Sequence, residues 1–211
     1  MRREFSIRWL VFFIGLMTLG LGVALTVKGQ FFGVGSWDVL HIGLFKQLGL
    51  TIGIWSILVG ILIIVISSIG LREFPKIGTL VNMTTVGVFI DFFNWLIPNP
   101  QTIVFQLMAF IAGVLLIGAG GGIYISANLG AGPRDSLMLL IVKKMKLSIT
   151  VARTIMEISV VIIGFLLGGP IGVGTIIMAL GMGPLMQASL HYSQLFLEKS
   201  LAGKKRIANY Q

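Results

Sequence analysis

Six long apolar segments constrain the fold of this chain more than any other feature. Each has the length of about 20 residues that a helix needs to cross the hydrocarbon core of a bilayer. Only 11% of the 211 residues are charged, against about 25% in a soluble domain, and the mean hydropathy is +0.99. We therefore expect an all-α membrane protein. The segments are Trp9–Val27, Ile52–Leu71, Gly78–Ile97, Ile103–Ile125, Ile149–Leu167 and Gly172–Leu190.

The formal net charge of +9 fits a membrane protein without a nucleic-acid partner, because lysine and arginine collect in cytoplasmic loops and tails. The chain has no cysteine, which excludes disulfides and thiolate metal sites. We expect His41 and His191 to lie at polar edges or at the membrane interface. Neither has a partner at metal-ligand spacing, so no metal and no cofactor is predicted.

The basic residues also predict the orientation of the chain. Residues 1–8 read as a cytoplasmic tail before an uncleaved signal-anchor, and residues 195–211 as a basic cytoplasmic tail. With both termini inside, Arg72, Lys76 and the lysines after the fourth span also lie inside, and only Lys28 and Lys46 fall outside. This asymmetry agrees with the positive-inside rule.

Two shorter segments, Gly33–Gln47 and Gly130–Met145, decide between two topologies. Each corresponds to about 22 Å of helix at 1.5 Å per residue, against a hydrocarbon core of about 30 Å. We therefore favour six transmembrane helices plus two short half-helices. The alternative has eight spans, with both short segments crossing fully and Arg72 outside.

The chain also reads as a duplicated unit. "GVGSWDVL" (33–40) and "GAGPRDSL" (130–137) share the pattern G-x-G-x-x-D-x-L, 97 positions apart. Flanking stretches agree as well: 19–30 with 117–128, 48–56 with 145–153, and 78–87 with 174–183. Residues 9–97 and 103–194 are thus predicted to be a first and a second membrane repeat.

The number of crossings decides how the two repeats relate. With three crossings per repeat, the second copy is inverted relative to the first, as in many secondary transporters. With four crossings per repeat, the copies are parallel. In either arrangement, the interface between the repeats is where a substrate site is expected.

Each Gly-x-Gly stretch should break one helix and start another. We expect Ser36 to cap the first short helix and Pro133 to occupy the first turn of the second. Such helix ends carry free N–H groups and partial positive charge. Asp38 and Asp135 then fall in the first turns, where they either stabilise the helix or contact a substrate or coupling cation.

Other polar residues interrupt the apolar segments, where they are costly. Arg153 and Glu157 are four residues apart and are expected to pair with each other. Asp91 is expected near the outer interface, and Asn82 to bond between helices. Trp9, Trp37, Trp95 and Tyr192 resemble interfacial anchors.

No catalytic constellation is present, and "GAGGG" (118–122) lacks the preceding strand of a dinucleotide-binding loop. We therefore expect no enzymatic activity and no catalytic residues.

Four stretches together resemble the YczE/YyaS/YitT family of bacterial integral membrane proteins, and the YczE branch most. They are "GVGSWDVL…GLTIGIWSILVG", "GTLVNMTTVGVFIDFF", "LGAGPRDSLM" and "GGPIGVGTIIMALGMGPLMQ". The resemblance covers about residues 9–194 and implies a location in the bacterial cytoplasmic membrane. It implies no settled activity.

The main functional hypothesis is a small-molecule secondary transporter or permease with its site between the repeats. The alternative is a non-transporting membrane protein that binds or regulates a partner enzyme; an enzyme acting on lipids is a third reading. Expected partners are the lipid bilayer, an unidentified small molecule or membrane-associated protein, and a second copy of the chain. The candidate site residues are Asp38, Asp135, Arg134, Arg153, Glu157, Gly33, Gly35, Gly130 and Gly132.

Overall fold

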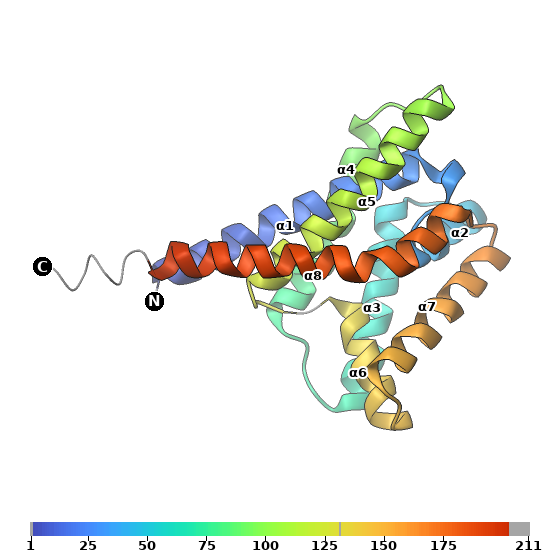
Figure 1. The fold of residues 1–211 in the computed structure, drawn as a ribbon. Helices are drawn as coiled ribbons and strands as arrows, with labels where there is room; N and C mark the ends of the chain where they lie inside the picture. The colour runs from blue at the N-terminus through green and yellow to red at the C-terminus, as the bar shows by residue number, and fades with distance from the viewer. Residues whose placement is uncertain (1, 131, 203–211) are drawn as a thin grey trace, which may run out of the picture.

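The computed structural model describes residues 2–130 and 132–202, and their regular elements are all helical (Figure 1). This confirms the all-α prediction for the described part of the chain. A short 3-10 turn, η1 (Gln30–Phe32), follows the first helix. The α-helices are α1 (Arg2–Lys28), α2 (Ser36–Leu48), α3 (Ile52–Leu71), α4 (Ile77–Leu96), α5 (Ile103–Ser126), α6 (Pro133–Met145), α7 (Ile149–Leu166) and α8 (Val173–Ala202).

Five of these helices, α1, α3, α4, α5 and α8, are long and apolar enough to cross a membrane. The remaining predicted span forms α7, which has 18 residues, carries Arg153 and Glu157, and is not among the five. Large apolar side chains are exposed along most of these helices, as expected for surfaces that face lipid. The total number of crossings stays a prediction.

The first and last helices of the chain, α1 and α8, extend beyond the predicted spans. Helix α1 begins at Arg2 and so includes most of the predicted tail 1–8, where Glu4 and Arg8 form an ion pair one turn apart, at 3.0 Å. Helix α8 continues to Ala202 and includes the start of segment 195–211. The basic residues 204–206 of the predicted tail lie outside the described residues.

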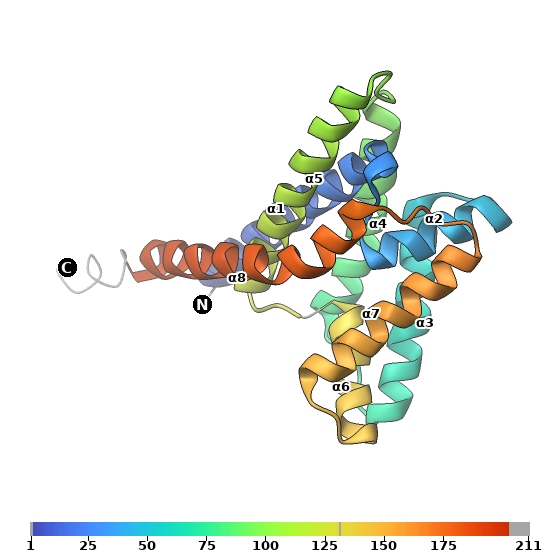
Figure 2. The ribbon, with the colours of Figure 1, turned by 45° about the vertical axis from the view of Figure 1, so that its right-hand side comes forward.

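Helices α1 and α5 pack closely along their lengths and run antiparallel (Figure 2). A Cβ atom added at Gly15 would lie 2.4 Å from the Tyr124 nitrogen, and one at Gly29 would lie 2.6 Å from the Gln106 oxygen. The residue numbers of the contacts therefore increase along α1 while they decrease along α5, as in an antiparallel pair. Glycine at these two positions allows the close approach, because a side chain would separate the two backbones.

Helix α2 lies beside the C-terminal half of α7, although 120 positions separate them. Trp37, near the start of α2, donates its indole N–H to Glu157, halfway along α7, at 3.3 Å. Further on, a Cβ atom at Gly43 would lie 2.8 Å from the Leu167 Cβ. At the end of α2, Lys46 donates to the Gly168 carbonyl at 2.9 Å. Helix α2 thus starts level with the middle of α7 and runs parallel to it.

Helix α6 makes the corresponding arrangement with α3. A Cβ atom at Gly60, near the middle of α3, would lie 3.6 Å from the Pro133 Cγ at the start of α6. A Cβ atom at Gly70, near the end of α3, would lie 2.5 Å from the Leu140 Cδ1. Both short helices therefore begin halfway along a longer helix and continue to its C-terminal end.

Helices α4 and α8 pack differently. Helix α4 lies against α3, and a Cβ atom at Gly87 would be 2.7 Å from the Gly53 oxygen. Helix α8 packs on α5 but diverges from α7 in both views (Figures 1 and 2). A Cβ atom at Gly181 or Gly183 of α8 would meet nothing within 4 Å. The side of the molecule formed by α3 and α4 is thus closely packed. The side formed by α7 and α8 is not, and we call it the open side.

Asp91 contributes to the close packing of α4 against α3, which α8 and α7 lack. Its carboxylate accepts a hydrogen bond from the Gly53 N–H at 2.8 Å and another from the Thr51 hydroxyl, both at the start of α3. The side chain, expected near the outer interface, therefore links α4 to the N-terminus of α3. In the predicted repeat alignment, Gln187 occupies the corresponding place in α8, and no bond from it to α7 exists among the described residues.

Candidate functional site

The first turns of the two short helices meet at the centre of the molecule. The guanidinium carbon of Arg134, the second residue of α6, lies 4.9 Å from the ring centroid of Trp37, the second residue of α2. This distance is within the range of a cation–π contact. We call the polar residues around this contact the central cluster. They are Trp37, Asp38 and His41 of α2, Arg134 and Asp135 of α6, and Arg153 and Glu157 of α7.

The sequence starts these helices in slightly different ways. Pro133 is the first residue of α6, after the N-cap Gly132, as predicted. The prediction that Ser36 caps α2 is wrong, because the extended Gly35 is the N-cap and Ser36 is already helical. The first helical bond runs from the Val39 N–H to the Gly35 carbonyl at 2.9 Å, so the backbone fixes this start without a side-chain cap.

Asp38 and His41 form a buried pair one helical turn apart. The Asp38 Oδ1 and the His41 Nδ1 face each other at 3.7 Å, and their side chains are 6% and 3% exposed. Neither atom makes a hydrogen bond with any described residue. The expectation of an interfacial His41 is therefore wrong, because α2 turns this side chain inward beside Asp38.

Trp37 and Glu157 form the contact between α2 and α7 within the cluster. The indole N–H donates to the Glu157 Oε1 at 3.3 Å, and Trp37 is 3% exposed. The prediction that Trp37 is an interfacial anchor is therefore wrong. So is the predicted pairing of Arg153 with Glu157, because no ion pair within 4.0 Å joins them among the described residues.

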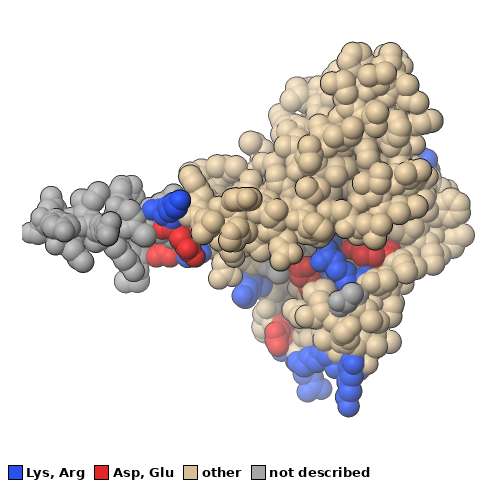
Figure 3. Space-filling model, in the orientation of Figure 1, with Lys and Arg blue, Asp and Glu red and all other residues tan. Residues whose placement is uncertain are grey.

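The remaining charged residues of the cluster lie on α6 and α7. Asp135 is the third residue of α6, and its backbone N–H donates to the Gly132 carbonyl at 3.2 Å. The two arginine side chains are exposed, whereas Asp135 and Glu157 are half-buried. Figure 3 shows acidic and basic atoms gathered in a furrow between the α8 side of the molecule and the part built from α6 and α7.

Two buried polar residues border the cluster from α4 and α5. Asn82 and Tyr124 are each 6% exposed. The Asn82 Nδ2 has no hydrogen-bond partner among the described residues, so the predicted inter-helix bond of Asn82 stays a prediction. A Cβ atom at Gly132 would lie 3.6 Å from the Tyr124 hydroxyl and 4.0 Å from the Asn82 Oδ1. Tyr124 was not predicted, because nothing in its glycine-rich surroundings marks a polar site.

The four candidate glycines divide into two groups. Gly35 and Gly132 directly precede the short helices and border the cluster. Gly33, with φ +106°, packs instead against the start of α8, where a Cβ atom would lie 2.6 Å from the Thr175 hydroxyl. Gly130 packs in the same way against the start of α4. These two glycines hold the loops in place outside the cluster.

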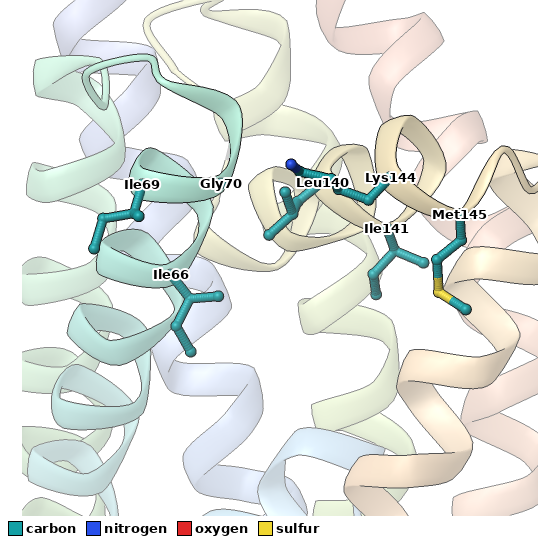
Figure 4. A pocket seen from close by; sticks show the side chains of 7 residues that line it. All are labelled: Ile66, Ile69, Gly70, Leu140, Ile141, Lys144 and Met145. Atoms are coloured by element: carbon teal, nitrogen blue, oxygen red, sulfur yellow. The ribbon is translucent and has the colours of Figure 1, made fainter.

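A shallow apolar depression of about 460 Å³ lies elsewhere, between the C-terminal ends of α3 and α6 (Figure 4). Ile66, Ile69 and Leu140 are among its lining residues, and Lys144 lies at its edge. It contains none of the predicted site residues. Among residues 2–130 and 132–202, no three His, Cys, Asp or Glu side chains gather as a metal site would require.

These features define the class of the protein: a helical membrane protein with a charged cluster where the first turns of two short helices meet. Residues 6–191 match the model described as "Family of unknown function (DUF6198)", and the chain belongs to this family.

Three curated proteins are similar in sequence to this chain over most of its length. It is 45% identical to "Uncharacterized membrane protein YczE" of Bacillus subtilis, over 96% of this chain and 94% of the relative. It is 35% identical to an "Uncharacterized protein" of Haemophilus influenzae (86% and 82% covered) and 29% identical to "Uncharacterized protein YyaS" of B. subtilis (94% and 98%). The resemblance predicted from the sequence motifs is therefore confirmed. No solved structure matches the chain.

Proposed function

We propose that this protein is a secondary transporter for a small molecule, which binds at the central cluster between two inverted repeats. The observation that carries the proposal is the meeting of the α2 and α6 first turns, at the buried Trp37 and the exposed Arg134, between the long apolar helices. Non-helical backbone and charged side chains at membrane depth are tolerated where protein buries them or water reaches them. Transporters place their substrate sites at such broken helices.

The antiparallel packing of α1 and α5 supports the inverted arrangement. These helices begin the two predicted repeats. With three crossings per repeat they traverse the membrane in opposite directions, and with four crossings they traverse it in the same direction. The contacts of Gly15 with Tyr124 and of Gly29 with Gln106 fit opposite directions. The six-span topology is therefore the one we propose, with both termini in the cytoplasm.

The positions of the short helices also support duplication. Helices α2 and α6 begin at Ser36 and Pro133 and end at Leu48 and Met145, a shift of 97 positions at both ends. Trp37 and Arg134, which stack on each other, are themselves 97 positions apart. A contact between equivalent residues is expected at a pseudo-two-fold axis, since the axis brings each position onto its counterpart.

The unequal packing of α4 and α8 suggests how such a protein could work. Gly87 lies against α3, whereas its repeat counterpart Gly183 faces open space beside α8. If the two halves exchange these arrangements, the cluster opens first to one side of the membrane and then to the other. This exchange is the alternating access of inverted-repeat transporters.

The charged residues receive separate roles under this proposal. Arg134 and Arg153 are exposed in the furrow and are the first groups that a substrate meets. Asp135 and Glu157 are half-buried and complement positive groups of the substrate. Asp38 lies behind them, near the N-cap Gly35, while Gly132 keeps the approach to Tyr124 open.

Single cysteines test the topology cleanly, because the chain has none of its own. The six-span proposal expects Glu73→Cys to react with a membrane-impermeant maleimide only from the cytoplasmic side, and Asn99→Cys only from the outside. The eight-span alternative expects the reverse for both. Lys146→Cys is the control, since both topologies place it in the cytoplasm.

Transport is tested in proteoliposomes with a compound first selected by thermal stabilisation of the detergent-solubilised protein. Asp135→Asn keeps the size of the side chain but removes its charge, and we expect it to abolish uptake while the protein stays folded. Glu73→Gln, in an exposed loop, is the matched control and should transport normally. Normal uptake by Asp135→Asn would argue against the proposed site.

The partner-binding alternative makes a different expectation. A protein that only binds or regulates an enzyme needs no exchange between the α3–α4 and α7–α8 arrangements. It would keep one fixed distance between α7 and α8 under all conditions, and Asp135→Asn would alter no flux.

A further inference from the structure

We propose that Asp38 and His41 form a proton-binding site, and that proton uptake there drives the conformational exchange. This inference rests on the proposed transporter function and names its coupling ion. It goes beyond the substrate site, because neither side chain of the pair opens to the furrow: the two are 6% and 3% exposed.

The geometry suits one shared proton. The Asp38 Oδ1 and the His41 Nδ1 point at each other from one face of α2, at 3.7 Å, without another hydrogen-bond partner among the described residues. This distance is about 0.5 Å longer than an N–H···O hydrogen bond. A proton on Nδ1 would let the imidazolium donate to Oδ1 and draw the two together.

Charge explains why proton uptake would matter. With His41 neutral, the pair carries a net charge of −1 in the membrane interior, which is costly. After one proton is taken up, an imidazolium faces a carboxylate and the net charge of the pair is zero. The charged and neutral states of α2 should therefore favour different packing around it.

The neighbouring helices supply few other charges to this pair. Arg134 of α6 lies over the ring of Trp37, next to Asp38 in the sequence, and Glu157 of α7 reaches the same region through its bond to Trp37. Helix α3, which also packs on α2, has no charged residue between Ile52 and Leu71. The charges that these neighbouring helices bring near the pair are therefore the Arg134 guanidinium and the Glu157 carboxylate.

The pair is also placed to transmit its charge state. Trp37 directly precedes Asp38 and holds both Arg134 and Glu157. A small movement of the first turn of α2 would shift α6 and α7 together. These helices border the open side of the molecule, next to α8.

The first experiment detects the proton directly by NMR of histidine-labelled protein in nanodiscs. The chain has two histidines, so His191→Gln leaves the signals of His41 alone. We expect these signals to change with pH, and Asp38→Asn to lower the midpoint by about one pH unit or more, because the carboxylate stabilises the imidazolium. An unchanged midpoint, or no titration, would overturn the proposal.

The second experiment measures the distance between spin labels at Ile158→Cys on α7 and Ala188→Cys on α8. Lowering the pH from 8 to 5.5 should shift the balance between two distances, and both His41→Gln and Asp38→Asn should abolish the shift. His191→Gln, on exposed α8, should keep it. A shift that survives both substitutions in the pair overturns the proton site.

The two experiments separate this inference from the proposed function. Two distances with a pH-independent balance would overturn the proton site and leave an alternating-access transporter. A single distance at every pH, in every variant, would overturn both.

Discussion

Arg134 lies over the ring of Trp37, with 4.9 Å between the guanidinium carbon and the ring centroid. The two residues come from the first turns of α6 and α2, so this contact joins the halves of the chain at its centre. Trp37 is almost completely buried and also bonds to Glu157 of α7. The Trp37 side chain therefore connects α2 to both α6 and α7.

This contact predicts an energetic coupling between the two residues. In a double-mutant cycle of Trp37→Leu and Arg134→Gln, we expect a coupling of about 0.5–2 kcal/mol, the range of partly desolvated cation–π contacts. Thermal unfolding in detergent measures it. Trp95→Leu combined with Arg134→Gln is the control, because Trp95 is 80% exposed and should show no coupling. Additive effects for the Trp37 pair would contradict the structure.

Asp91→Ala should destabilise the fold by about 1–3 kcal/mol, because it leaves the Gly53 N–H without its acceptor. It should also loosen α4 from α3, which proteolysis or cysteine accessibility in α3 would detect. Glu73→Ala removes a carboxylate from an exposed loop and should change stability very little. Equal effects of the two substitutions would show that Asp91 does not hold the α3 terminus.

Gly43→Ala should push α2 away from α7, because the added Cβ would lie 2.7 Å from the Gly164 oxygen. We expect a loss of about 1–3 kcal/mol in unfolding free energy. Gly181→Ala is the matched control in open space, and should be neutral or stabilising by about 1 kcal/mol through helix propensity. The melting temperatures of the two variants make the comparison, and a stable Gly43→Ala would mean that the two helices lie further apart.

Gly183→Trp should leave the described fold intact and block the exchange of packing, because its side chain would fill the space that α7 needs when it approaches α8. The distance between labels on α7 and α8 should then stay at its long value under all conditions. Leu180→Trp, where the residue is already 75% exposed, should leave the exchange unaffected. A short distance in Gly183→Trp would refute the proposed movement.

The sequence alone predicted much of the helical framework. The apolar segments match the helices closely in the middle of the chain, as Ile52–Leu71 does for α3, because length, hydropathy and flanking breakers are local properties. The two short helices were predicted for the same reason: Pro133 starts one, and a glycine precedes each. The ends were less certain, as α1 and α8 show, because no breaker stops a helix outside an apolar segment.

The tertiary structure decided what the polar residues contact. The sequence suggested that Arg153 pairs with Glu157 and that His41 and Trp37 face an interface. Instead, Glu157 bonds to Trp37, and His41 lies buried beside Asp38. These contacts join α2 to α7 across 120 positions, and spacing within one helix carries no information about them. Hydropathy fixes which segments leave water, but the packing of one backbone against another determines which charges meet inside.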